Sequence, residues 1–200
     1  MNPLIYIFVI LLLLFLNVSM VLLFVLAFDS IWRGHDLATS QRAIKALIKI
    51  ISRHKPDAKN FYDLGCGRGT LVLAVKRRLP CLRVYGIDNN EIRIFFARLK
   101  SIFLGQKINP VRNVISNGVN FKKQDIFETN LENADIVYTY LRYDLMPLLE
   151  KKLQDELKQS AIVITNTSNF PNWKPIEKII TYPKVSKMPD FETLFVYIKK

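Results

Sequence analysis

The feature that most constrains the fold of this chain is an uncharged apolar run near its N-terminus. Residues 4–28 (LIYIFVILLLLFLNVSMVLLFVLAF) contain no Asp, Glu, Lys or Arg, and about 20 apolar residues are enough for a helix to cross a bilayer. A cleaved signal peptide would begin with a basic segment and have a shorter apolar core, whereas Met1, Asn2 and Pro3 carry no basic side chain. The run therefore predicts one transmembrane helix that anchors the chain in the bilayer.

Basic residues follow the apolar run, and none precedes it. They are Arg33, Arg42, Lys45, Lys49, Arg53 and Lys55. Basic flanks stay on the cytoplasmic side, so we expect a single-pass membrane protein whose globular part faces the cytoplasm. The net charge of +12 suits an anionic membrane surface, which attracts each nearby Lys or Arg by about 1 kcal/mol. Charge is the only indication of nucleic acid, so we expect no such partner.

The remainder of the chain alternates between helix-like and strand-like segments. Thr39 or Ser40 can cap an amphipathic helix that ends before Pro56, with Ile44, Leu47, Ile48 and Ile51 on one face. The expected strands are 60–64, 83–88, 121–124, 134–141, 161–166, 176–183 and 191–200, and the expected helices are 70–78, 91–104 and 144–158. Repeated strand–helix–strand units predict a three-layer α/β fold with a mostly parallel sheet. The last two strands have no helix between them, so we expect them to pair antiparallel.

Two segments carry more specific expectations. The helix over 91–104 is expected to bury its most apolar face, formed by Ile92, Phe95, Phe96, Leu99 and Phe103. Residues 105–120 form a connection much longer than the usual 2–6 residues between a helix and a strand. They are interpreted as a surface insertion in which Asn117 and Gly118 make a tight hairpin turn.

A glycine-rich turn, DLGCGRGT at residues 63–70, follows the first of these strands. Gly65, Gly67 and Gly69 recur at every second position, whereas a dinucleotide site has G-x-G-x-x-G spacing. A phosphate-binding loop would end in G-K-[ST], which is absent. The two cysteines, Cys66 and Cys81, form no metal-ligand cluster, so no metal site is expected.

The pattern D-x-G-x-G-x-G at the end of a first strand resembles the S-adenosylmethionine site of the class I, Rossmann-like methyltransferases with seven strands. The resemblance implies that Asp63, Gly65, Cys66, Gly67 and Gly69 hold the methionine end of the cofactor. It further implies that Asp88, beside Asn89 at the tip of the second strand, binds the ribose hydroxyls. Asp125 and Ile126, after the third strand, would then contact the adenine. All three acids follow strand ends, where ligands bind in open parallel sheets.

Two further stretches narrow the resemblance. MPLLEKKLQDEL at 146–157 and NFPNW at 169–173 are similar to the ATP-synthase c-subunit lysine N-methyltransferase family and its prokaryotic relatives, whose members also carry an N-terminal hydrophobic segment. The resemblance implies methylation of lysines in membrane proteins. The chain departs from the family's D-L-G-S-G-D-G-R at Cys66, Arg68 and Thr70, which leaves its acceptor open.

The expected organisation has an anchor at 1–28, a connector and amphipathic helix at 29–58, and an S-adenosylmethionine-dependent methyltransferase domain at 59–200. In the family the residues after the fourth strand line the acceptor pocket, which here implies Tyr138, Thr139 and Tyr140. The acceptor is expected to be a lysine of a membrane or membrane-associated protein, with a lipid headgroup or quinone as the alternative. Phe170 and Trp173 fit either a core or a membrane interface. A non-catalytic binding protein of the same fold is a further alternative.

Overall fold

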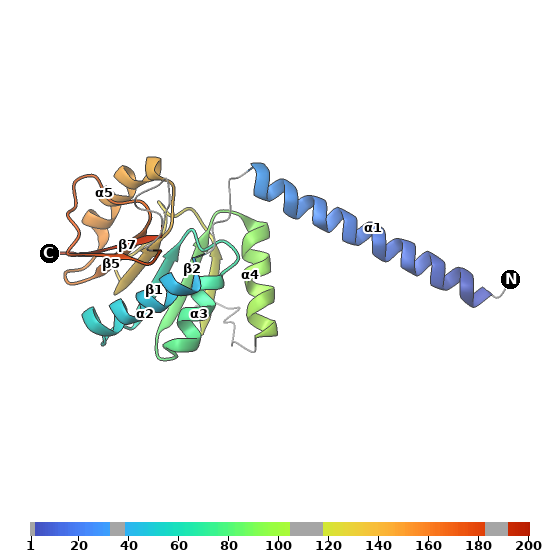
Figure 1. Cartoon of the computed structure of the whole chain (residues 1–200), viewed down its shortest axis with the longest axis horizontal. Coiled ribbons are helices and arrows are strands. Elements are labelled where there is room, and N and C mark those ends of the chain that lie inside the picture. The colour runs from blue at the N-terminus through green and yellow to red at the C-terminus, as the bar shows by residue number, and fades with distance from the viewer. Residues whose placement is uncertain (1–2, 33–38, 105–117, 183–191) are drawn as a thin grey trace. The chain divides into compact units, whose positions relative to one another are not determined.

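The computed structural model describes residues 3–32, 39–104, 118–182 and 192–200 (Figure 1). The chain divides into two compact units, residues 1–37 and 38–200. The described residues of the first unit form one helix, and those of the second form a seven-stranded sheet with its covering helices.

Helix α1 spans Pro3–Trp32, four residues beyond the end of the expected span. Within it, Pro3–Val25 is long and apolar enough to cross a membrane, and none of its most apolar window is buried. Length and composition are the whole basis of this assignment, which a signal sequence would also satisfy. The expected apolar N-terminal helix is therefore present.

The sheet of the second unit has the order β3-β2-β1-β4-β5-β7-β6. Its strands are β1 Asn60–Leu64, β2 Arg83–Asp88, β3 Val119–Lys123, β4 Ile136–Thr139, β5 Ile162–Asn166, β6 Glu177–Ile180 and β7 Thr193–Ile198. Strands β1 to β5 pair in parallel, whereas β7 is antiparallel to both β5 and β6. The expected mostly parallel sheet and its antiparallel final pair are confirmed.

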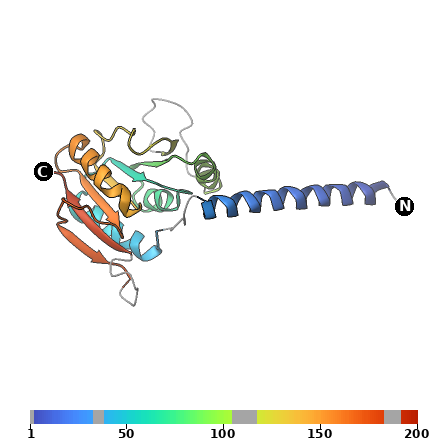
Figure 2. The same cartoon turned by 90° about the horizontal axis from the view of Figure 1, so that it is seen from above.

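Helices cover both faces of this sheet (Figures 1 and 2). Their bounds are α2 Gln41–His54, α3 Thr70–Arg78, α4 Glu91–Phe103 and α5 Met146–Glu156, with a short 3₁₀ turn at Tyr143–Leu145. Buried side chains of α2, α3 and α4 share one apolar cluster, and those of α5 belong to another. Helices α4 and α5 therefore cover opposite faces of the sheet. Ser40 caps α2 through the Ala43 amide, as expected.

Helix α4 buries a different face from the one expected. Its buried residues are Ile94, Ala97 and Ser101, while Phe95 and Phe103 are 58% and 81% exposed. Small side chains are needed against the sheet because Ala97 lies beside the glycine turn, where a Cβ on Gly69 would be 3.0 Å from the Ala97 Cβ. Close approach of helix and sheet selected the small face of α4, and the larger apolar face points away from the sheet.

The two C-terminal motifs meet in the second apolar cluster. Phe170 is buried, and its ring packs against Tyr197 at a centroid distance of 4.9 Å and against Trp173 at 5.7 Å. The Glu150 carboxylate on α5 accepts a hydrogen bond from the Asn172 amide at 3.1 Å. Of the two interpretations for Phe170 and Trp173, the structure shows packing in the core of the domain. The expected insertion lies largely outside the described residues, because they stop at 104 and resume at 118.

Strands β3 and β6 form the two edges of the sheet. The Glu177 carboxylate on β6 accepts a hydrogen bond from Arg53 at 2.9 Å, and its other oxygen lies 2.8 Å from His54 Nε2, so this edge is tied to the end of α2. On β3, Lys122 and Lys123 are exposed, and Lys123 pairs with Glu91 at 2.9 Å.

Candidate functional site

The glycine turn begins where β1 ends and closes against β2. The amides of Gly65 and Cys66 both donate to the Ile87 carbonyl, at 2.9 and 3.0 Å, and the Gly69 amide donates to the Cys66 carbonyl at 2.9 Å. Gly65, Gly67 and Gly69 all have positive φ, a region that glycine enters without steric cost. The spacing seen in the sequence therefore reflects a backbone path that returns to β2 before α3 starts.

Two of these positions, and one that sequence reasoning missed, are also crowded. A Cβ on Gly69 would lie 2.5 Å from the Phe121 ring, and a Cβ on Gly65 would lie 2.7 Å from Leu141 Cδ2. Gly86, inside β2, faces the same Phe121 ring at 2.6 Å and the Cys66 sulfur at 2.9 Å. A glycine within a strand signals close approach of another group, so the run RVYGID could have identified it.

Two buried acids lie beside the turn. Asp88 accepts the Gly67 amide on Oδ2 and the Asn90 amide on Oδ1, both at 2.9 Å. Asp63 is only 3% exposed, and within the described residues no hydrogen bond or ion pair reaches its carboxylate. Burial, and then repulsion from Asp88, raise the pKa of Asp63 to about 8. A buried acid without a counter-charge is suited to a cationic ligand group.

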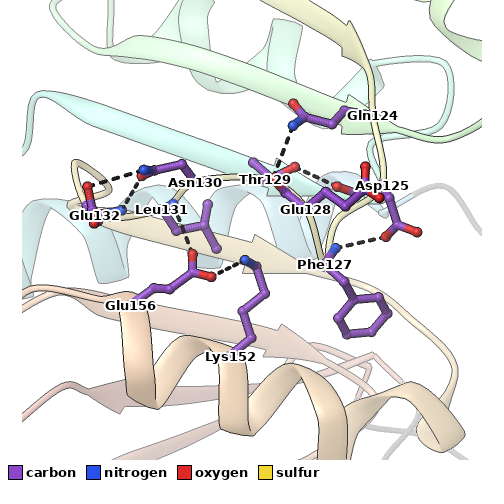
Figure 3. A network of polar contacts seen from close by, with 10 residues as sticks. All are labelled: Gln124, Asp125, Phe127, Glu128, Thr129, Asn130, Leu131, Glu132, Lys152 and Glu156. Carbon is purple, nitrogen blue, oxygen red and sulfur yellow. Dashed lines mark hydrogen bonds and ion pairs between the residues drawn. The ribbon is translucent and has the colours of Figure 1, made fainter.

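Asp125 starts a loop that a chain of polar contacts holds in place (Figure 3). Its Oδ1 accepts the Phe127 amide at 2.8 Å, and its carbonyl accepts the Thr129 hydroxyl at 2.8 Å. Farther along, Glu156 of α5 accepts the Leu131 amide at 3.3 Å and pairs with Lys152. Asp125 is exposed, while Ile126 and Asn89 are half-buried and exposed respectively. The loop is therefore fixed at both ends. The hydrogen bonds just described use Asp125 Oδ1 and the Asp125 carbonyl, and neither uses Oδ2.

The three residues predicted for the acceptor pocket differ in environment. The Tyr138 hydroxyl is buried, lies 2.9 Å from Thr39 Oγ1 and accepts Asn166 Nδ2 at 3.1 Å. Burial raises the pKa of Tyr138 well above its usual range. Thr139 is fully buried and donates to the Leu64 carbonyl at 3.3 Å. Tyr140, at the end of β4, is half-buried.

All these groups gather at one edge of the sheet. Strands β1, β2, β3 and β4 are parallel, so Asp63, Asp88, Asp125 and Tyr140 occupy or follow their carboxyl ends. Thr39 and Asn166 were not expected there, because neither stands in a motif. Their place at the site follows from the buried Tyr138 hydroxyl, with which both form hydrogen bonds. The described residues contain no group of three or more His, Cys, Asp or Glu side chains able to hold a metal.

The matches to known proteins agree with this geometry. Residues 63–177 match the family model described as the ANTKMT methyltransferase domain. A protein-lysine N-methyltransferase of Saccharolobus islandicus is 24% identical over 160 residues, which are 80% of this chain and 90% of that protein. The lysine N-methyltransferase of the ATP synthase c-subunit from Xenopus laevis is 27% identical over 113 residues, 56% of this chain and 45% of that protein.

A solved structure shares the fold. The RNA methyltransferase from Salinibacter ruber, in complex with S-adenosyl-L-homocysteine, superimposes with a TM-score of 0.65 at 19% identity, covering 81% of this chain and 93% of its own. The expected Rossmann-like methyltransferase architecture is confirmed. The resemblance to lysine methyltransferases drawn from the two C-terminal motifs is confirmed as well.

Proposed function

The chain belongs to the ANTKMT methyltransferase domain family, and from that premise we propose that it transfers a methyl group from S-adenosylmethionine to a lysine of a membrane or membrane-associated protein. Two of its relatives are named for lysine methylation, one as a protein-lysine N-methyltransferase and the other as the lysine N-methyltransferase of the ATP synthase c-subunit. In the proposed arrangement α1 anchors the enzyme in a membrane, with the catalytic domain on the cytoplasmic side.

The observation that carries the cofactor assignment is the uncompensated Asp63. A buried carboxylate with a pKa near 8 and no hydrogen bond within the described chain is stabilised by an ammonium group, and the methionine end of S-adenosylmethionine carries one. Asp88 would hold the ribose hydroxyls and Asp125 the adenine amino group, beside Ile126. The turn of Gly65, Cys66, Gly67 and Gly69 would let the backbone approach the methionine moiety.

The reaction requires little chemistry from the side chains. The cofactor, when bound, supplies a methyl group on a sulfonium that is already a good leaving group. The chain must align the amine with the methyl carbon and exclude water. A lysine amine has a pKa of about 10.4 and must lose its proton before it attacks. We assign Tyr140 to direct the amine, since it is the one of the three predicted residues that is not fully buried.

Tyr138 and Thr139, which were predicted to line the acceptor pocket, receive a different role. Both hydroxyls are buried and hydrogen-bonded to groups of the domain. We propose that they position β4 beneath the acceptor, with Tyr140 alone contacting it.

Membranes incubated with the purified full chain and radiolabelled methyl donor test this proposal. Label should appear in protein bands and, after hydrolysis, in methylated lysine. Label in the solvent-extracted lipid fraction would instead support a lipid headgroup or quinone acceptor. The Asp88→Ala variant is the control. Folded protein that binds no S-adenosylmethionine in calorimetry would refute the enzyme assignment.

A further inference from the structure

Helix α4 presents an apolar face that is exposed except at Phe96 and Leu99, which are half-buried. The face consists of Ile92, Phe95, Phe96, Leu99, Ile102 and Phe103, spaced at three- and four-residue steps along the helix. Ile102 and Phe103 are 62% and 81% exposed, and Phe95 is 58% exposed. Among the described residues of the second unit, half of the ten exposed large apolar side chains lie on α4 or at its C-cap, Leu104. Such concentration on one helix marks an interaction surface.

Basic side chains lie on both sides of this face. At about 100° per residue, Arg93 and Lys100 fall along one border, and Arg98 falls along the other next to Glu91, which pairs with Lys123 at 2.9 Å. Within the described chain, Arg98 donates to the Phe121 carbonyl at 2.8 Å and Lys100 to the Thr70 hydroxyl at 3.0 Å, so both of these hydrogen bonds go to uncharged oxygens. An apolar helix face with cationic borders is the pattern of helices that lie in the interface of an anionic bilayer.

The covalent link to α1 favours a bilayer over other occupants. Only residues 33–38 separate α1 from Thr39, and such a connector reaches at most about 25 Å. If α1 crosses a membrane, Thr39 stays within that distance of the end of α1, so the domain is held near the headgroups, where its net positive charge is attracted. We propose that the α4 apolar face docks on the anionic membrane surface as a second, interfacial contact. This inference rests on the membrane anchoring proposed above.

Docking through α4 would have a consequence for the site. The face begins at Ile92, four residues after Asp88, and α4 starts directly after the strand that carries this acid. A docked α4 therefore holds the cofactor edge of the sheet close to the membrane surface. An acceptor lysine just above the bilayer would meet the site there, without having to reach a domain that floats free on its connector.

Three matched probe positions test the proposal in the full chain. Leu14 on α1, Ile102 on α4 and Leu148 on α5 are each 62% exposed. Each is replaced by cysteine in a Cys81→Ser background, in which Cys66 is buried, and is labelled with bimane. The proteins are placed in nanodiscs of phosphatidylcholine and phosphatidylglycerol, with or without lipids that carry a nitroxide quencher on the upper acyl chain. Leu148 is the control because α5 covers the opposite face of the sheet from α4.

We expect the Ile102 probe to lose at least about twofold more of its fluorescence to the quencher than the Leu148 probe, because interfacial helices bury their apolar face roughly 5–10 Å into the headgroup and acyl boundary. Equal quenching of the two probes overturns the docking of α4. A blue-shifted but unquenched Ile102 probe also overturns it, since protein then covers the face. The Leu14 probe separates the two proposals: if it is not quenched, the anchoring itself fails, and if only Leu14 is quenched, anchoring holds and docking fails.

Discussion

The candidate site lies at the carboxyl ends of the parallel strands, and its polar groups play different roles in the two halves of the sheet. On the β1–β3 half, backbone amides and acids point at each other across a tight turn, and Asp88 accepts two amides while Asp63 accepts none that the structure describes. On the β4–β5 half, the hydroxyls of Tyr138 and Thr139 are buried and satisfied within the domain. The first half keeps a buried acid, Asp63, that no described group of the domain satisfies, whereas the second uses its polar groups to hold the strands.

The largest expected effect belongs to the crowded glycine turn of the first half. Gly69→Ala should lower the free energy of unfolding by about 2–4 kcal/mol, because it combines a strained positive φ with overpacking against Phe121. Urea unfolding of the full chain in detergent, followed by tryptophan fluorescence, measures it. Adding Phe121→Leu should recover part of the loss, and an unchanged midpoint for Gly69→Ala would contradict the crowding.

The next effect tests the buried Asp63 of this half. The pKa of Asp63, about 8 in the folded domain, lies above its ordinary value of 3.8, so the protonated form favours folding. The free energy of unfolding without ligand should therefore fall as pH rises from 6 to 8, by on the order of 1 kcal/mol per pH unit from this group. Asp63→Asn should remove that slope, and saturating S-adenosylmethionine should flatten it. If the unfolding free energy depends on pH equally in wild type and in Asp63→Asn, groups other than Asp63 cause that dependence.

Cofactor affinity separates the acids from one another. Asp88→Ala should weaken S-adenosylmethionine binding by more than about tenfold, or roughly 1.4 kcal/mol, since it removes both the proposed ribose acceptor and the bond to Gly67. Asp125→Ala, at an exposed position, should weaken it less. Calorimetry of the two variants beside the parent gives the ranking. Unchanged affinity in folded Asp88→Ala protein would rule out the ribose assignment.

The smallest effects probe the second half through a matched pair of tyrosines. Tyr138→Phe should cost about 1 kcal/mol of unfolding free energy, because Asn166 and Thr39 each lose a partner. It should lower turnover less than Tyr140→Phe does. Tyr140→Phe should leave stability unchanged and lower kcat with little change in cofactor affinity. Urea unfolding and initial methylation rates measure the two variants. If Tyr138→Phe instead lowers kcat and Tyr140→Phe lowers the unfolding free energy, Tyr138 is the residue that contacts the acceptor.

The same contrast explains what the sequence could predict. The glycine turn, the position of the acids at the strand ends and the antiparallel final pair follow from local patterns along the chain, and the structure has them where they were expected. The cofactor roles of the acids stay predictions. The buried face of α4 was predicted wrongly, because the rule that the most apolar face is buried fails where the glycine turn requires the small Ala97 and Ser101 beside Ile94. Thr39 and Asn166 could not be found, since their role depends on where the Tyr138 hydroxyl lies in three dimensions. The Asn117–Gly118 hairpin stays a prediction.

The edge strands of the sheet, β3 and β6, would have a consequence if α1 anchors the protein in a membrane as proposed. Two-dimensional confinement brings copies together often, and an open strand edge invites them to add strands to one another. Here β3 ends its edge with Lys122 and Lys123, and β6 carries Glu177, which Arg53 and His54 hold against the domain. Like-charged and tethered edges resist such pairing, so the sheet is protected against polymerising at the high local density that anchoring would create.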